Sequence, residues 1–161
     1  MRAFRFLGVA ASGICDAAEL TATARRAESM GYSGLVLPDH LVGQHAPIPV
    51  LATVAAVTET LRIGTFVVNA GLRHPAVLAQ DLASLDVLSG GRLEIGIGAG
   101  WHRPEHDAIG VPFGSTGTRI GRLEEAIEVL KGCFGESPFS FTGTHFLVEL
   151  PDSSVTNDWS P

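Results

Sequence analysis

Short, nearly continuous apolar runs alternate with amphipathic stretches along most of the chain. The runs begin near residues 3, 34, 61 and 92, a spacing of about thirty residues, which is the size of one strand–helix unit. Each run is followed by a stretch with helical periodicity. Strands that are apolar throughout are typical of a parallel sheet whose two faces are both covered. The pattern therefore predicts four βα units with parallel strands.

Local signals predict where the helices begin and end. Asp16, followed three residues later by Glu19, predicts an N-cap, and Gly31 predicts the end of that helix. Proline is well tolerated at the first helical position, so Pro47 and Pro75 predict two further helix starts. The buried stripes expected for the first, third and fourth helices are Leu20, Ala24, Ala27 and Met30; Leu78, Leu82, Leu85 and Leu88; and Ile120, Leu123, Ile127 and Leu130.

The pattern changes after Phe134. Alternating apolar residues flank the turn sequence Thr142, Gly143, Thr144, which predicts a β-hairpin. The last residues are polar and bounded by prolines, which is typical of a disordered end. We therefore divide the chain into a βα part over residues 1–134, a hairpin over residues 135–150 and a disordered tail over residues 151–161.

Composition narrows the classes of function. The 161 residues fit one domain, and the 11 basic and 17 acidic residues give a net charge of −6, which offers no broad basic field for nucleic acid. No apolar stretch reaches the ~18 residues expected of a membrane span, so no membrane partner is expected. Cys15 and Cys133 have no paired spacing, which argues against a disulfide framework or a zinc knuckle. A reducing cytoplasm is the expected location.

Four βα units are compatible with two architectures. A doubly wound open sheet would be complete at this length, whereas a (β/α)8 barrel would be half built. No G-x-G-x-x-G motif follows the first strand, and Gly96, Gly98 and Gly100 lead into a loop, which weakens the dinucleotide-binding version. Both architectures bind ligands beyond the carboxyl ends of the strands.

Polar residues at those strand ends are the candidates for chemistry. Asp39 and His40 follow the second strand, and a histidine beside a carboxylate is suited to proton transfer. An equally open interpretation is that Asp39 caps the loop and His40 is a solvated rim residue. Asn69 follows the third strand, where its amide can both donate to and accept from a planar heterocycle.

The other candidates have structural interpretations. Gly71 and Arg73 favour simple turn chemistry, and Trp101 favours a core plug over a stacking surface. The residues His102, Glu105, His106 and Asp107 match no helix-borne ligand pair, so we expect a solvated loop and no metal. The charged face of the last helix is expected to be a solvated surface; it carries Arg119, Arg122, Glu124, Glu125 and Glu128. A hydrolase with a G-x-S-x-G nucleophile has no support.

Several segments in order resemble the luciferase-like monooxygenase superfamily, particularly its branch of oxidoreductases that use the deazaflavin coenzyme F420. The segments are ARRAESMGYSGLVLPDHL, TETLRIGTFVVNAGLRHPAVLAQDLASLDVLSGGRLEIGIGAGW, EHDAIGVPF and RIGRLEEAIEVLKGCF, which lie within residues 3–134. The hairpin FSFTGTHFLV is similar to the insertion that follows the fourth helix in this family. The resemblance implies an α/β fold. It would be the N-terminal half of a (β/α)8 TIM barrel, with about four βα units in that half, plus a β-hairpin insertion.

The resemblance also implies a coenzyme site. The ring of F420 or a flavin would lie across the carboxyl-terminal mouth of the barrel, with Asp39 at a position that hydrogen-bonds the ring and His40 at a proton-accepting position. The family's non-prolyl cis peptide would fall at Phe66 and Val67. The segment that lines the ring after the fourth strand would be Ala99, Gly100 and Trp101. Sugar-phosphate dehydrogenases of the family carry a catalytic glutamate where this chain has Trp101, so neither their substrate nor their acid is transferred.

The resemblance predicts an F420-dependent oxidoreductase that transfers a hydride to or from an unidentified small organic substrate. An FMN-dependent luciferase-like monooxygenase is the neighbouring alternative. Family members continue through four more strands, so we expect a truncated protein and leave open whether it is itself an enzyme. A half barrel exposes strand edges and an apolar inner face, so a second alternative is a non-catalytic remnant that folds only as an oligomer, for example with a second copy of itself. A complete small α/β binding protein is a weaker third.

Overall fold

A computed structural model describes residues 4–10, 16–135 and 138–151 of the chain. It comprises two compact units, Met1–Val68 with Leu85–Gly96, and Asn69–Ser84 with Ile97–Pro161. Each unit is described by itself. Most of the tail predicted to be disordered, residues 152–161, lies outside the described residues.

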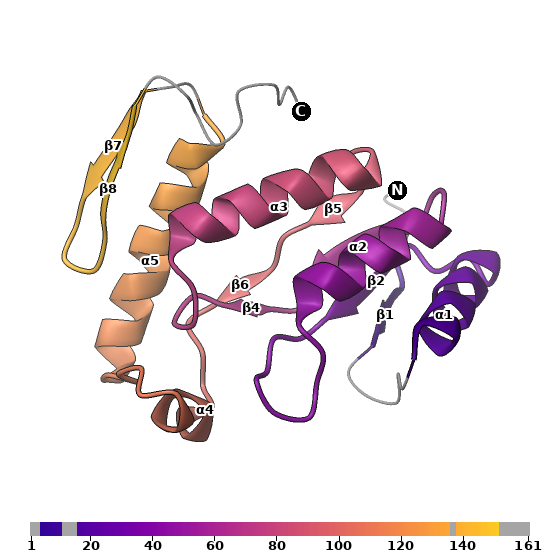
Figure 1. The fold of residues 1–161 in the computed structure, drawn as a ribbon, viewed down its shortest axis with the longest axis horizontal. Coiled ribbons are helices and arrows are strands. Elements are labelled where there is room, and N and C mark those ends of the chain that lie inside the picture. The colour runs from indigo at the N-terminus through magenta and orange to yellow at the C-terminus, as the bar shows by residue number, and fades with distance from the viewer. Residues whose placement is uncertain (1–3, 11–15, 136–137, 152–161) are drawn as a thin grey trace. The chain divides into compact units, whose positions relative to one another are not determined.

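The first unit is built on a four-stranded parallel sheet in the order β1-β2-β3-β5. Its strands are β1 (Leu7–Val9), β2 (Gly34–Leu37), β3 (Arg62–Thr65) and β5 (Leu93–Glu94). The register aligns the end of β2 with the end of β3, because Leu37 pairs with Thr65. Helices α1 (Ala17–Ser29) and α2 (Pro47–Val57) lie side by side (Figure 1) and pack on Leu35, Leu37 and Ile63 of the sheet. The predicted parallel βα units are present.

The helix signals of this unit are confirmed. The Asp16 carboxylate accepts a hydrogen bond from the backbone N–H of Glu19 at 2.8 Å, and Gly31 follows the end of α1 with a φ of +78°. Glycine has no Cβ to clash in this left-handed conformation. The predicted burial of Met30 is wrong, because it is the C-cap residue and its side chain is 62% exposed.

Two charged side chains join elements of the first unit. Arg92 donates from its guanidinium to the carbonyl oxygens of Ala55, Leu61 and Ser89 at 2.6–2.9 Å, and so satisfies a carbonyl in the last turn of α2. The Glu28 carboxylate accepts from the backbone N–H groups of residues 59, 60 and 61 at 2.7–2.9 Å. Led by the bond from Thr60, these donors lower the pKa of Glu28 to about 2 although desolvation opposes them.

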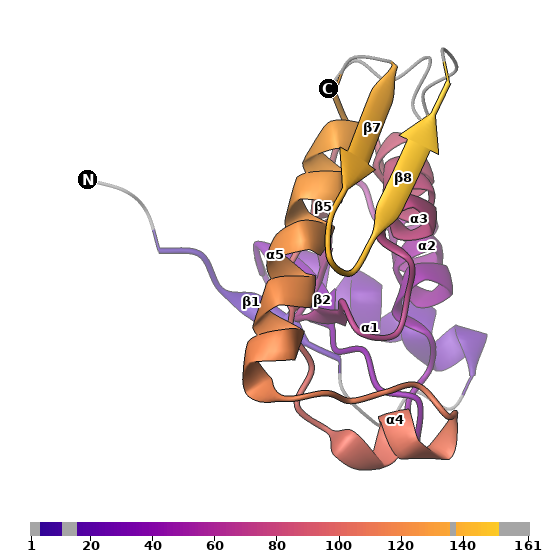
Figure 2. The same cartoon turned by 90° about the vertical axis from the view of Figure 1, so that its left-hand side faces the viewer.

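The second unit contains the short pair β4 (Val68–Asn69) and β6 (Ile97–Gly98), most of α3 (Pro75–Ser89), α4 (Arg103–Ala108) and α5 (Thr116–Cys133). The predicted hairpin is confirmed: β7 (Phe139–Thr142) pairs antiparallel with β8 (Leu147–Leu150). Figure 2 shows it alongside α5. The predicted third and fourth strands are each split in two. Thr65 ends β3, the peptide between Phe66 and Val67 is cis, and Val68 then donates to the Gly96 carbonyl at 2.8 Å.

The buried stripes are partly corrected. Leu78, Leu82 and Leu85 are buried as predicted, but Leu88 is 69% exposed and Ser89 takes its place in the interior. At about 100° per residue, position 89 returns to within about 20° of position 78, whereas position 88 lies about 80° away. In α5 the buried face is Ala126, Val129, Leu130 and Cys133, and Ile120 is 47% exposed because it lies about 120° from Ala126.

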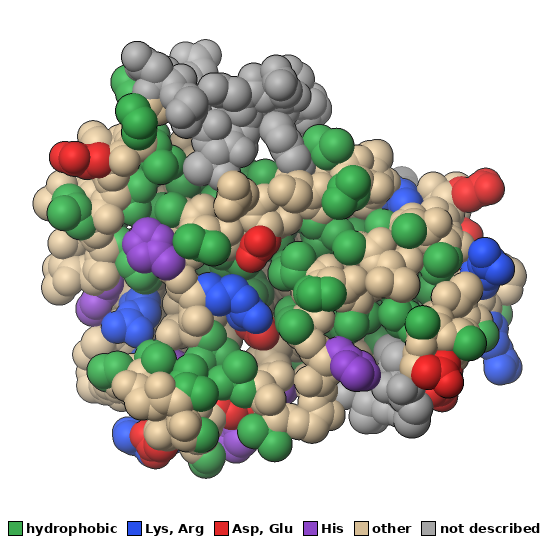
Figure 3. Space-filling view, viewed as in Figure 1, with side chains coloured by type: hydrophobic (Ala, Val, Ile, Leu, Met, Phe, Trp, Pro, Cys, Tyr) green, Lys and Arg blue, Asp and Glu red, His purple; other side chains and the backbone are tan. Residues whose placement is uncertain are grey.

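No helix among the described residues is both long enough and apolar enough to cross a membrane. On the face drawn in Figure 3, acidic and basic side chains of the described residues are scattered among apolar ones.

Candidate functional site

In the first unit, four of the predicted site residues lie at the carboxyl ends of two neighbouring strands. Asp39 and His40 follow β2, and Phe66 and Val67 follow β3. The two strands are paired to their last residues, and the backbone N–H of Phe66 donates to the Leu37 carbonyl at 2.7 Å. Asp39 is buried, at 5% exposure, and His40 is half-buried. The structure therefore brings these four residues to one end of the sheet.

An apolar surface is open at the end of β3. Phe66 is 62% exposed and Val67 is 40% exposed, and the peptide between them is cis, as predicted. Thr65 fixes the neighbouring backbone, since its hydroxyl donates to the Gly96 carbonyl at 2.7 Å. Large apolar groups open to solvent beside a buried carboxylate and an imidazole suit a flat ligand with an apolar face and a polar edge. The residues present therefore fit the ring of a flavin or deazaflavin.

In the second unit, the structure brings Asn69 beside the segment of residues 99–101. The backbone of Ala70 donates to the Gly98 carbonyl at 2.9 Å, which aligns the ends of β4 and β6. Asn69 is 7% exposed; its Oδ1 accepts from the Gly71 N–H at 2.8 Å, which confirms the predicted turn. The proposed contact of Asn69 with a heterocycle stays a prediction.

Gly100 is held from two sides. Its φ is +75°, and a Cβ added there would lie 2.5 Å from Asn69 Oδ1. On the other side, Nε of Arg119 donates to the Gly100 carbonyl at 3.2 Å. Nη1 of Arg119 donates to the Gly114 carbonyl at 3.2 Å, and the guanidinium lies 4.1 Å from the centre of the Phe113 ring. Arg119 was expected to be a solvated surface residue, and that expectation is wrong. Its position in an amphipathic helix pattern gave no signal of a contact with a loop nineteen residues earlier.

Trp101 is not a core plug. Its side chain is 73% exposed, and its ring centre lies 5.0 Å from that of His102. The buried ring nearby in the sequence is His106, which is 1% exposed and meets the Phe113 ring edge to face at 5.1 Å.

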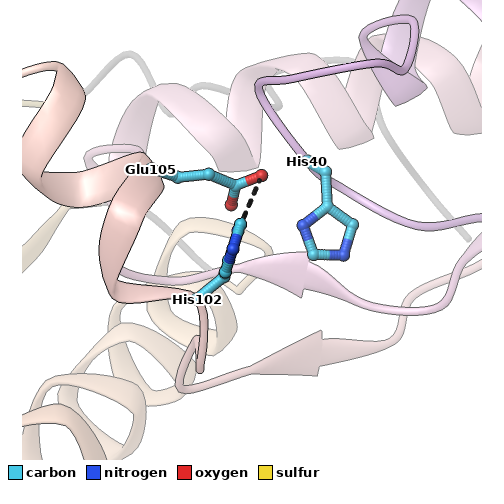
Figure 4. Close-up of side chains that lie close together, drawn as sticks. All are labelled: His40, His102 and Glu105. Carbon is cyan, nitrogen blue, oxygen red and sulfur yellow. Dashed lines mark ion pairs between the residues drawn. The ribbon is translucent and has the colours of Figure 1, made fainter.

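The predicted solvated loop over residues 102–107 is also wrong, because residues 103–108 form α4. Its inner face buries two polar side chains, Glu105 at 2% exposure and His106 at 1%. Glu105 Oε1 lies 3.5 Å from Nδ1 of His102, the N-cap residue of α4, and the two side chains face one another in Figure 4. A buried carboxylate beside a partly exposed imidazole is an arrangement that can hold the ring and exchange a proton.

Glu125 of α5 is a second residue that the sequence reasoning misplaced on a solvated surface. Its carboxylate accepts from the backbone N–H groups of Thr144, His145 and Phe146 at 2.8–3.1 Å and so fixes the hairpin turn. Desolvation raises the pKa of Glu125, but the three N–H donors outweigh it, so the pKa lies below its ordinary value. Sequence separation concealed this contact, because the turn lies about twenty residues beyond Glu125.

Comparisons with known proteins identify the family of the chain. The family model described as luciferase-like monooxygenase matches residues 4–158. The F420-dependent glucose-6-phosphate dehydrogenase of Kineococcus radiotolerans is 37% identical over 138 residues, which are 81% of this chain and 40% of that protein. The FMNH2-dependent dimethylsulfone monooxygenase of Pseudomonas putida is 34% identical over 103 residues, 64% of this chain and 28% of that protein.

A solved structure shows the same fold. The coenzyme F420-dependent tetrahydromethanopterin reductase of Methanopyrus kandleri superposes with a TM-score of 0.80 at 23% identity, over 92% of this chain and 45% of that one. The chain thus spans less than half the length of these relatives, and its fold is the N-terminal portion of their (β/α)8 barrel, with the hairpin. On the family match and on this fold, the chain belongs to the luciferase-like monooxygenase family.

Proposed function

We propose that this chain carries the coenzyme-binding strand ends of an F420-dependent oxidoreductase that transfers a hydride to or from a small organic substrate. The observation that carries the proposal is the open apolar surface of Phe66 and Val67 at the same sheet end as Asp39 and His40. The 37% identity with an F420-dependent dehydrogenase supports the choice of coenzyme.

Each of these residues has a distinct part in the proposal. The coenzyme, when bound, supplies the acceptor or donor of the hydride. Phe66 and Val67 contact the apolar face of the ring and exclude water from it. The buried Asp39 binds a polar group at the ring edge, and the half-buried His40 exchanges the proton that accompanies the hydride. In the second unit, Ala99, Gly100 and Trp101 line the ring and Asn69 offers its amide. The substrate itself is an organic molecule of unassigned class.

A flavin enzyme is the second candidate. The 34% identity with a monooxygenase that uses FMNH2 favours it specifically. The same apolar surface fits the ring of FMN, since both rings are planar tricycles. In that case the substrate would be oxygenated instead of dehydrogenated.

Titration of the chain with F420 and, separately, with FMN tests both candidates. The fluorescence of each coenzyme reports binding, and tighter binding of F420 by tenfold or more would support the first candidate. The test variant is Val67→Asp, which places a charge on the apolar surface. The matched control is Val87→Asp, because Val87 is a 57% exposed valine of the same unit that belongs to no proposed site.

Burying a carboxylate against an apolar ring is strongly unfavourable, so Val67→Asp is expected to weaken coenzyme binding by about 100-fold or more. Val87→Asp is expected to leave binding unchanged. Failure of the folded wild-type chain to bind either coenzyme would overturn the proposal. Equal effects of the two substitutions would show that Val67 is not part of the site.

A further inference from the structure

We propose that His102 is a catalytic acid–base residue of this oxidoreductase and that the buried Glu105 is its positioning residue. The inference rests on the proposed function and deepens it. It names a proton-handling group in the second unit, as the alternative to His40 of the first unit.

The position of His102 in the fold is the first observation. It lies two residues after Gly100, at the point where the chain leaves β6 and enters α4. Strand ends of this kind are where barrels of this class place their catalytic side chains. His102 is 37% exposed at its side chain, so part of the imidazole is accessible to a ligand.

The partner of His102 is the second observation. Glu105 is 2% exposed, and its Oε1 lies 3.5 Å from Nδ1 of His102 (Figure 4). Carboxylates are rarely buried to this extent unless they are paired. At 3.5 Å the two atoms lie within ion-pair distance but are farther apart than in a charge-assisted hydrogen bond. The nearby carboxylate favours a proton on Nδ1, which leaves Nε2 as the nitrogen that can take up or release one.

Neighbouring contacts hold the helix that carries Glu105. Glu105 lies on α4, whose neighbouring residue His106 is anchored by Asn69 Nδ2 at 3.4 Å and by the edge of the Phe113 ring. The centre of the exposed Trp101 ring lies 5.0 Å from the centre of the imidazole. A catalytic group needs this kind of fixed orientation, because small misplacements reduce the rate strongly.

Oxidation of a secondary alcohol, used as the probe substrate, shows where each hydrogen would go. In this assignment His102 takes the proton in place of His40. The O–H bond would break and its proton would pass to Nε2 of His102, the carbon–oxygen bond would become a double bond, and the carbinol hydrogen would leave as a hydride to the deazaflavin when that coenzyme is bound. The alcohol is oxidised by two electrons to a ketone and the deazaflavin is reduced by two electrons. Reduction of a ketone runs in reverse, with the proton returned from the imidazolium.

Nitrogen-15 NMR of the imidazoles in the full chain tests the pair without a substrate. His102 is expected to be the Nδ1–H tautomer, assigned by its loss in His102→Gln. Glu105→Gln is expected to weaken this preference, whereas Asp107→Asn, an exposed acid on the same helix, is expected to leave it unchanged. An Nε2–H tautomer of His102 in the wild-type chain would overturn the proposal. An Nδ1–H tautomer whose population is the same in wild type and in Glu105→Gln would also overturn it. Circular dichroism melting shows whether each variant is folded.

Steady-state oxidation of 2-propanol and cyclohexanol by the chain with F420 tests the catalytic role. His102→Ala is expected to lower kcat by about 100-fold or more with little change in KM or in F420 affinity, and added imidazole is expected to restore part of the loss. Glu105→Gln is expected to lower kcat by about tenfold. Full activity of a folded His102→Ala variant would overturn the inference alone, whereas failure of the wild-type chain to bind F420 would overturn the proposed function. A wild-type chain that binds F420 but oxidises neither alcohol would overturn the catalytic role of His102, and the tautomer measurement would then report only on its pairing with Glu105.

Discussion

Replacement of Gly100 by alanine tests whether the segment of residues 99–101 depends on the close packing of Asn69 and Gly100. Gly100 has a φ of +75°, and an added Cβ would lie 2.5, 2.8 and 2.9 Å from the Oδ1, Nδ2 and Cγ atoms of Asn69. The substitution therefore combines two costs. Placing an L-residue in the left-handed region costs about 1–2 kcal/mol, and forcing a methyl group into a filled space costs about 1–3 kcal/mol.

A second glycine separates these two costs. Gly110 lies in the same unit with a φ of +70°, and nothing lies within 4 Å of a Cβ added there. Gly110→Ala should therefore lose only the conformational part, about 1–2 kcal/mol of unfolding free energy. Gly100→Ala should lose about 2–5 kcal/mol. Urea denaturation followed by circular dichroism measures both values.

A double-mutant cycle identifies the cause of the difference. In an Asn69→Ala background the carboxamide is absent, so the cost of Gly100→Ala should fall to that of Gly110→Ala, with a coupling energy of about 1–3 kcal/mol. The reasoning is refuted if Gly100→Ala costs no more than Gly110→Ala in the wild-type background, or if its cost is the same with and without the Asn69 side chain.

Three further substitutions test other contacts. Glu28→Gln should lower the free energy of unfolding by about 1–2 kcal/mol at neutral pH after allowance for solvent screening. Because the pKa of Glu28 is lowered to about 2, this difference from wild type should shrink as the pH falls from about 4.5 towards 2. Melting at several pH values measures it, and Glu59→Gln is the control. Glu125→Gln should speed amide hydrogen exchange at residues 144–146, where the carboxylate accepts three bonds, and Glu124→Gln should not. Leu82→Ala should lower the free energy of unfolding by about 3 kcal/mol, measured by urea denaturation. Leu88 is 69% exposed, so Leu88→Ala should change the free energy of unfolding by less than about 0.5 kcal/mol. Equal effects of the two substitutions would contradict the assignment of the buried face of α3.

The elements were predictable because each depends on local chemistry. The Asp16 cap, the glycine after α1 and the prolines at the starts of α2 and α3 all act within a few residues. The apolar runs identified the strands and the resemblance identified the barrel, which the family match and the superposition confirm. The apolar pattern did not predict the split of the third strand, because Phe66 and Val67 continue that pattern without interruption. Only the family resemblance indicated it, through the cis peptide expected at Phe66 and Val67.

The errors at Glu125 and Arg119 share one physical origin. Charged residues on an amphipathic helix were interpreted as solvated, yet Glu125 binds a turn and Arg119 binds a loop that are distant in sequence. Periodicity identifies which side chains leave the helix on one face, but it carries no information about the backbone groups that meet that face. Buried N–H and C=O groups require partners, and long charged side chains are able to reach them. Such contacts are therefore decided by tertiary structure.

The same requirement explains why the polar cluster of α4 was missed. As a sequence, Glu105 and His106 lie between two prolines in a polar stretch, which favours a loop. In the fold, His106 fills space beneath Gly71, where an added Cβ would lie 2.7 Å from its ring, and this packing carries Glu105 into the interior with it. Burial then makes the carboxylate dependent on a partner, and the adjacent N-cap histidine is within reach. A core residue thereby supplies the orientation of a group at the strand end, and substitution of His106 should disturb the His102 tautomer even though the two imidazoles are on different sides of Glu105 in sequence.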